Sequence, residues 1–209
     1  MKKYFTFFAL AMMALSTAAF AGTTATNSNT VSPTLQISAT IQSAVSLTLS
    51  TGTSAAPAHC AVTTGTGADY AMDFGTVDAL AINNGACNKF APTTPGQTDA
   101  IYWSDYNLTP VFTSQSASSN ASITAKVSTN FGATSDLTVV RDSANSSTLP
   151  SGVASFVPIS TTTPDTIASA VASGTAQIRF IGVQVAPTNA TGIPTTPQTA
   201  VVTFTLTVQ

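Results

Sequence analysis

The sequence contains no glutamate, one histidine, one tryptophan and few charges of either sign. All eight acidic residues are aspartates, and charged residues make up 7% of the 209. So few lysines and arginines cannot form the basic patch that nucleic acids or anionic lipids require. Apolar residues still make up 44% of the chain, enough to bury a core that offsets the entropy lost on ordering. The composition therefore indicates a folded protein with a nearly neutral surface and no nucleic-acid partner.

Few titratable side chains are available to act as catalytic acids or bases. His59 is the one available imidazole, and it lies in a Pro-Ala-His-Cys stretch where a structural role is expected. The carboxylates of Asp69, Asp73 and Asp78 have no spacing that defines a catalytic pair. We therefore expect no enzymatic activity, no cofactor and no metal site.

The N-terminus has the three parts of an export signal. Lysines at positions 2 and 3 precede the apolar stretch Tyr4–Leu15, and Ala19-Phe20-Ala21 is a small-x-small cleavage site. Residues 1–21 are thus predicted to be a signal peptide of bacterial type, so that the exported chain begins at Gly22. No other segment approaches the roughly 20 apolar residues that span a bilayer. We expect an extracellular or cell-surface protein that is not inserted in a membrane after cleavage.

Cys60 and Cys87 are the two cysteines of the chain. An even pair in an exported protein predicts a disulfide. The alternative is a pair of free or metal-binding thiols. A zinc site would need further ligands, and His59 alone is a poor supplement.

Alternation of apolar and polar residues dominates the rest of the chain. From Leu35 to Leu49 apolar residues recur at every second position apart from Ser43, as in a strand with one buried face. Separated by loops rich in Ser, Asn, Gly and Pro, further strands are expected at 70–77, 100–112, 122–131, 137–141, 153–159, 176–186 and 200–208. This rhythm predicts an all-β, immunoglobulin-like antiparallel sandwich formed by a single domain, residues 44–209. One helix or loop is expected between Thr163 and Gly174.

Aromatic residues gather at positions 102–106. Tyr102, Trp103 and Tyr106 are candidate contacts for a glycan or a protein, because aromatic rings with polar tips are common in such sites. The other interpretation places both tyrosines in the core and Trp103 over a strand edge.

Two short motifs resemble a known family. Cys60-Ala61-Val62 is followed by Asp73-Phe74-Gly75-Thr76-Val77 and by Cys87, and the chain ends in an alternating strand. This order resembles the pilin subunits of chaperone–usher fimbriae and the related spore-coat-U-like secreted domains. The loop from Ser50 to His59 is longer than in that pattern, and Val208 stands where a tyrosine is usual.

The resemblance implies a sandwich that lacks one strand and is completed by strand exchange with the next subunit. Residues 22–43 would then be a polar leader and donor strand, with Leu35, Ile37, Ala39 and Ile41 inserted into a neighbour. The implied function is that of a structural subunit of an adhesive surface fibre, with itself, a periplasmic chaperone and an outer-membrane usher as partners. The alternative is a self-contained, monomeric coat or binding module, in which 35–49 is one internal strand.

Overall fold

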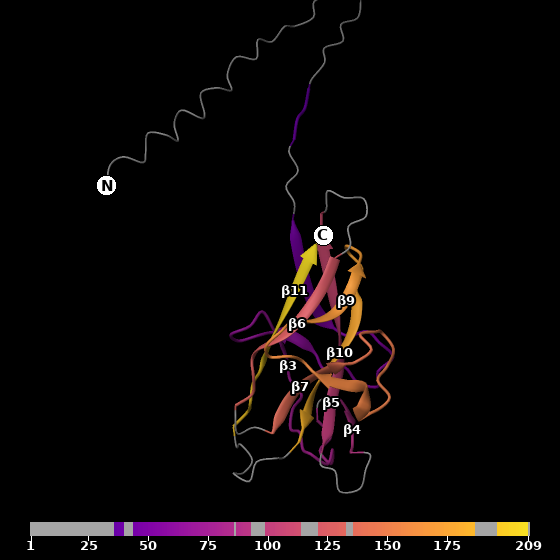
Figure 1. Cartoon of the computed structure of the whole chain (residues 1–209), viewed down its shortest axis with the longest axis vertical. Helices are drawn as coiled ribbons and strands as arrows, with labels where there is room; N and C mark the ends of the chain where they lie inside the picture. The colour runs from indigo at the N-terminus through magenta and orange to yellow at the C-terminus, as the bar shows by residue number, and fades with distance from the viewer. Residues whose placement is uncertain are drawn as a thin grey trace, which may run out of the picture. The chain divides into compact units, whose positions relative to one another are not determined.

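Figure 1 shows the computed structural model of the chain. The structure describes residues 36–39, 44–85, 87–92, 99–113, 121–132, 136–186 and 196–208. The chain divides into two units, Met1–Ile41 and Gln42–Gln209. In the first unit only 36–39 are described. They are exposed and have no regular secondary structure, and the expected signal peptide lies outside the described residues.

The second unit is an all-β antiparallel sandwich, which confirms the predicted fold class. Its larger sheet has the strand order β1-β5-β10-β7-β8, with β4 also paired to β5. A second sheet has the order β11-β6-β9, and β2 and β3 form a separate hairpin. The strands are β1 (Val45–Thr51), β2 (Val62–Thr64), β3 (Tyr70–Met72), β4 (Asn88–Phe90), β5 (Ala100–Phe112), β6 (Ala121–Thr129), β7 (Leu137–Asp142), β8 (Phe156–Pro158), β9 (Asp165–Val171), β10 (Gln177–Val185) and β11 (Val201–Val208). A 3-10 turn, Val153–Ser155, precedes β8.

The main core lies between the two sheets. On β6, Ile123, Ala125 and Val127 alternate with more exposed polar residues and point at the larger sheet. They meet Tyr106 and Leu108 of β5, both almost fully buried. In β6, the residues that alternate in the sequence between apolar and polar therefore alternate in the structure between buried and more exposed positions.

Strand β5 is buried on both faces, because the main core covers one face and a second apolar cluster covers the other. Trp103 points away from the main core, where it forms a second apolar cluster with Phe180 and Phe156. Proline in a strand is normally confined to an edge or a bulge, and Pro110 lies opposite Leu47 of β1. The pairing with β10 ends at Leu108, so the missing N–H of Pro110 removes no bond to that strand, and its carbonyl still accepts from Gly174 N at 2.7 Å.

The segment after Thr163 is a strand, β9, and neither the expected helix nor a loop. Ile167, Ala168 and Val171 are buried, a spacing that resembles one face of a helix. In the structure this spacing results from irregular pairing with β6, where the register shifts on both sides of Ile123. Ala170 has a φ of 52°, in the left-handed region. This local change of backbone direction turns the side chain of Val171 toward the core.

Arg179 connects the two sheets. It belongs to β10, is 8% exposed, and its Nε donates to the carbonyl of Ile167 on β9 at 2.7 Å. Burial lowers the pKa of this guanidinium, which nevertheless stays charged, and it lies near Asp142 and Tyr106. Burial raises the pKa of Tyr106, so this phenol stays neutral in the core.

In the part of the chain that the structure describes, no helix has the length and apolarity needed to cross a bilayer.

Candidate functional site

The most distinctive surface is formed by two strands that each lack a partner on one side. Among the described strands, β1 pairs with β5 alone and β11 pairs with β6 alone. On the opposite side of the sandwich, the chain crosses from one sheet to the other. There Ile159 N donates to Val139 O and Val127 N donates to Ser160 O, both at 3.0 Å. One side of the core is thus bridged by hydrogen bonds. On the other side, no described strand pairs with the free edge of β1 or β11, although Val62 of the β2–β3 hairpin packs against the main core and its N–H donates to Thr51 Oγ1 at the end of β1 at 2.9 Å.

The side chains beside these two edges are only partly covered. The inward-facing residues of β11 and β1 pack against the main core but stay half-buried, whereas those of β6 and β9 are almost fully buried. Phe204, for example, contacts Tyr106 with ring centroids 5.6 Å apart. We define the open side as the half-buried, inward-facing residues of both strands: Leu47, Leu49, Val202, Phe204, Leu206 and Val208.

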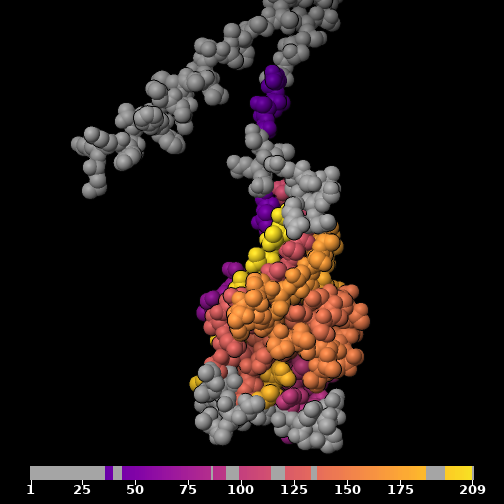
Figure 2. Space-filling view, in the orientation of Figure 1, coloured from indigo at the N-terminus to yellow at the C-terminus, as the bar shows by residue number. Residues whose placement is uncertain are grey.

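The two edges run in opposite directions. Val45, at the start of β1, is opposite Phe112 at the end of β5, and Val208, at the end of β11, is opposite Ala121 at the start of β6. Figure 2 shows the indigo start of β1 beside the yellow end of β11. We call this end of the sandwich, which carries Val45 and Val208, the upper end. A strand placed between the two edges and antiparallel to β11 would run away from the upper end.

The candidate donor residues are only partly described. Ile37 is 83% exposed and Ala39 is also exposed, while Leu35 and Ile41 lie outside the described residues. β1 begins at Val45, so the alternation from Leu35 to Leu49 is not one continuous strand in the described residues.

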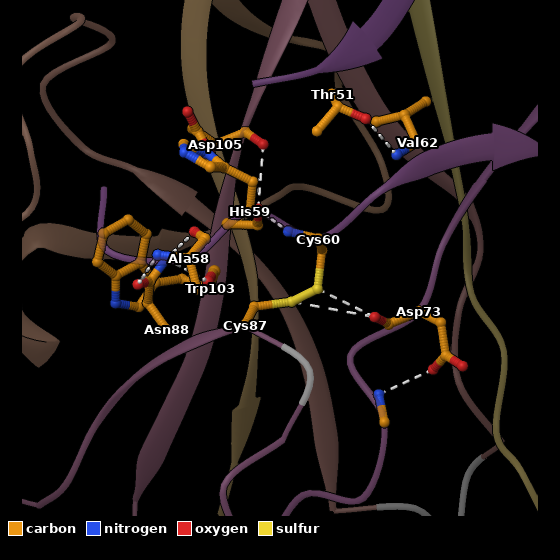
Figure 3. The surroundings of a disulfide bond; sticks show 12 residues. Thr51, Ala58, His59, Cys60, Val62, Asp73, Cys87, Asn88, Trp103 and Asp105 are labelled. Carbon is orange, nitrogen blue, oxygen red and sulfur yellow. Dashed lines mark hydrogen bonds and ion pairs between the residues drawn. A yellow bond between two sulfur atoms is a disulfide. The ribbon is translucent and has the colours of Figure 1, made fainter. Parts of the chain in front are cut away.

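The two cysteines form a disulfide, as predicted. Cys60 and Cys87 have a Cα–Cα distance of 5.3 Å, within the usual range. Figure 3 shows the Asp73 carbonyl oxygen beside both sulfurs and Cys60 N directed away from them. Cys60 N donates to Ser104 Oγ at 2.8 Å, which attaches the disulfide to β5.

His59 forms an ion pair that sequence reasoning missed. Its Nδ1 lies 2.6 Å from Oδ1 of Asp105 (Figure 3), a side chain with no exposed area. Ser54 N donates to the other carboxylate oxygen at 2.8 Å. Burial raises the pKa of Asp105, but the hydrogen bonds from Ser54 and His59 outweigh it and hold the pKa below its usual value. These two contacts attach the segment that carries Ser54 and His59 to β5.

The aromatic cluster lies inside the fold. Tyr102, Trp103 and Tyr106 are 0%, 4% and 3% exposed, so they are not available as surface contacts for a glycan or a protein. The tyrosines occupy core positions, as the second interpretation expected. Trp103 stacks on Phe90 with centroids 5.5 Å apart and does not cover a strand edge.

Asp78 organises the loop between β3 and β4. Its carboxylate accepts from the backbone N–H groups of Leu80, Ile82 and Asn83 at 2.9, 3.1 and 2.7 Å. Burial raises the pKa of Asp78, but these three donors outweigh it and lower the pKa to about 2. The folded loop therefore prefers the ionised carboxylate.

Replacing Asp78 should make the loop less stable in a pH-dependent way. We expect Asp78→Ala to lower the free energy of unfolding at pH 7 by about 1 kcal/mol, as for loss of a helix cap. A carboxylate with a depressed pKa stabilises the fold above its unfolded value of about 4 and loses this effect as the pH falls. The difference from wild type should thus shrink between about pH 4 and the folded pKa of about 2. Urea unfolding at several pH values measures it, with exposed Asp69→Ala as the control; a pH-independent difference would contradict the assignment.

Comparison with known proteins gives one structural neighbour. No protein-family model matches the chain, and no curated protein matches it. Among solved structures, the P pilus rod subunit PapA is similar over 72% of this chain and 99% of its own, with 13% identity and a TM-score of 0.37.

Proposed function

We propose that the protein is a non-catalytic, exported structural subunit that polymerises into an adhesive surface fibre by strand donation. In each junction, residues 35–41 of one subunit fill the space between β1 and β11 of its neighbour. The single observation that carries the proposal is the open side: two unpaired, oppositely directed edges flanked by half-buried apolar residues. The partner is a second copy of the chain.

The donor and the acceptor match in length and pattern. Residues 35–41 are seven residues long, and the edges of β1 and β11 are seven and eight residues long. Leu35, Ile37, Ala39 and Ile41 would all point into the core from one side of an inserted strand. Because the two edges run in opposite directions, an inserted strand is antiparallel to one of them and parallel to the other. The chain's own leader, folded back as a hairpin on β1, would be antiparallel to β1, whereas a strand from a second molecule can be antiparallel to β11.

An uncovered open side also calls for protection before assembly. Half-buried apolar residues next to free backbone N–H and C=O groups promote aggregation. We therefore include in the proposal a periplasmic chaperone that covers this side of the single subunit and an outer-membrane usher that exchanges it for the next subunit.

Removing the donor segment tests the proposal. A chain lacking Gly22–Ser43 should accept a strand but not donate one, so it should form no fibres in electron micrographs. A synthetic peptide of residues 32–43 should bind it and raise its thermal midpoint, with a stabilisation of about 2.7 kcal/mol at 100 times the dissociation constant.

Matched peptides identify the face that enters the neighbour. Ile37→Asp in the peptide should abolish the stabilisation, because a charge would enter an apolar site without a partner. Gln36→Asp should have little effect, since that side chain points away from the core of the neighbour. A full exported chain that stays monomeric at every concentration would overturn the proposal and leave the self-contained module.

A further inference from the structure

The loop between β3 and β4 contains the one Asn-Gly dipeptide of the sequence, Asn84-Gly85. The backbone nitrogen that follows an asparagine can attack the side-chain Cγ and close a five-membered succinimide ring. Glycine in the second position favours this attack, because it has no Cβ to obstruct the approach. Whether the ring closes in the folded protein depends on the groups around the reacting atoms.

The packing of the loop requires glycine at position 85. Gly85 has a φ of 48°, in the left-handed region. A Cβ added there would lie 2.8 Å from Cδ1 of Tyr102 and 3.3 Å from the carbonyl oxygen of Phe74. Any other residue would therefore be strained and would collide with a buried ring. The unobstructed second residue of the dipeptide is thus a consequence of the fold.

The attacking nitrogen is free to react. In the part of the chain that the structure describes, no hydrogen bond engages the N–H of Gly85, and the Asn84 side chain is exposed. Water can therefore remove the proton from this nitrogen and later open the ring. Asn145 offers a contrast, because the N–H of the following residue, Ser146, donates to Oδ2 of Asp142 at 3.1 Å.

Lys89 contacts the oxygen on which charge develops. Its Nζ donates to Oδ1 of Asn84 at 3.1 Å and to the carbonyl oxygen of Asn83 at 2.8 Å. Attack at Cγ moves an electron pair of the carbonyl bond onto Oδ1, and a cation already placed there stabilises this oxyanion. The contact with Asn83 holds the ammonium in position before the reaction begins.

We propose that Asn84 is a site of spontaneous deamidation, with Lys89 stabilising the oxyanion. Gly85 N loses its proton to water and bonds to Cγ of Asn84; the Cγ–Nδ2 bond then breaks, and ammonia leaves with a proton from water. A second water opens the ring at Cγ to give aspartate, or at the main-chain carbonyl to give isoaspartate. Nothing is oxidised or reduced, and the inference does not depend on strand donation.

The aspartate product fits the existing contacts. Its carboxylate would stand where Oδ1 of Asn84 lies, next to the Lys89 ammonium, so that a neutral hydrogen bond becomes an ion pair. The conversion adds one negative charge to a chain whose formal net charge is −2. An exported subunit would accumulate this charge with time, and the modified fraction would record its age.

Mass spectrometry of the folded, exported chain tests the site. After incubation at mildly alkaline pH, the peptide with residue 84 should gain about one mass unit, as replacement of –NH2 by –OH requires. Asn145 is the internal control: Arg141 Nη1 donates to its Oδ1 at 3.0 Å, but the following N–H is occupied. No gain at residue 84, or an equal gain at both sites, would overturn the inference. So would a lasting loss of ammonia that joins Asn84 to Lys89 and resists hydroxylamine.

Two variants test the role of Lys89. Lys89→Met should slow the reaction about tenfold, less than the loss of a buried oxyanion donor, because the loop is exposed. Lys89→Arg keeps a cation and should react nearly as fast as the wild type. In urea the Lys89→Met and wild-type chains should react at the same rate, since the contact is lost. A folded Lys89→Met chain that reacts as fast as the wild type, or a difference that persists in urea, would refute the assignment to Lys89.

Discussion

Gly52→Ala should lower the free energy of unfolding by about 3 kcal/mol, although it adds one methyl group. A Cβ at position 52 would overlap the carboxylate of Asp105, whose side chain has no exposed area. Asp105 would have to leave its hydrogen bonds with His59 and Ser54, and no other buried donor replaces them in the described residues. Guanidinium unfolding of the variant at pH 7 measures the loss.

A double-mutant cycle tests whether this loss of stability comes from the overlap between the added Cβ at position 52 and the Asp105 carboxylate. In an Asp105→Ala background the carboxylate is absent, so Gly52→Ala should cost far less than in the wild type. Gly152→Ala is the matched control and should change stability by less than about 0.5 kcal/mol, because its added Cβ meets no atom within 4 Å. Because the pKa of Asp105 is depressed in the fold, its contribution is present at neutral pH and is lost in acid. Additive effects in the cycle would contradict this explanation.

Removing the disulfide should be comparably costly. Cys60→Ala with Cys87→Ala opens a loop of 27 residues, and the loop-entropy relation gives about 3 kcal/mol, or a decrease of about 10 °C in the thermal midpoint. The closed loop contains the β2–β3 hairpin and the segment that Asp78 organises. Differential scanning calorimetry with and without a reductant measures the effect.

The reductant provides the control for the disulfide. It should shift the wild type to the midpoint of the double variant and leave the double variant unchanged. Mass spectrometry should show the intact protein two mass units lighter than the fully reduced chain, as the loss of two hydrogens requires. Two free thiols in the exported protein would contradict the bond and its stabilising role.

The sequence predicts the bounds of β5, β6 and β10 within two residues. In β6 the reason is burial on one face, which imposes a period of two on Ile123, Ala125 and Val127. β9 was missed because irregular pairing puts Ile167 and Ala168 on the core side together. A bulge depends on the partner strand, which a local pattern does not contain.

The candidate site likewise has features that the sequence predicts and features that it does not. The donor residues and the apolar series ending at Val208 are local alternations, and the sequence shows both. The pairing of His59 with Asp105 depends on the segment from Gly52 to His59 crossing the outer face of β5, a contact between distant parts of the chain. In the loop that Asp78 organises, the exposure of Leu80 and Ile82 contradicts their hydrophobicity, so no sequence pattern indicates it.

The pairing of β1 with β5 has a mechanical consequence. A pull on the N-terminal leader acts along β1, and antiparallel backbone hydrogen bonds lie perpendicular to that direction. The ladder from Val45 to Thr51 is then loaded in shear, so its bonds share the force and must rupture together rather than one after another. If β1 does detach, the tension passes to Cys60, where the covalent link to Cys87 prevents the next 27 residues from extending. The first strand thus resists as a unit, and the disulfide limits how far the subunit can lengthen after it yields.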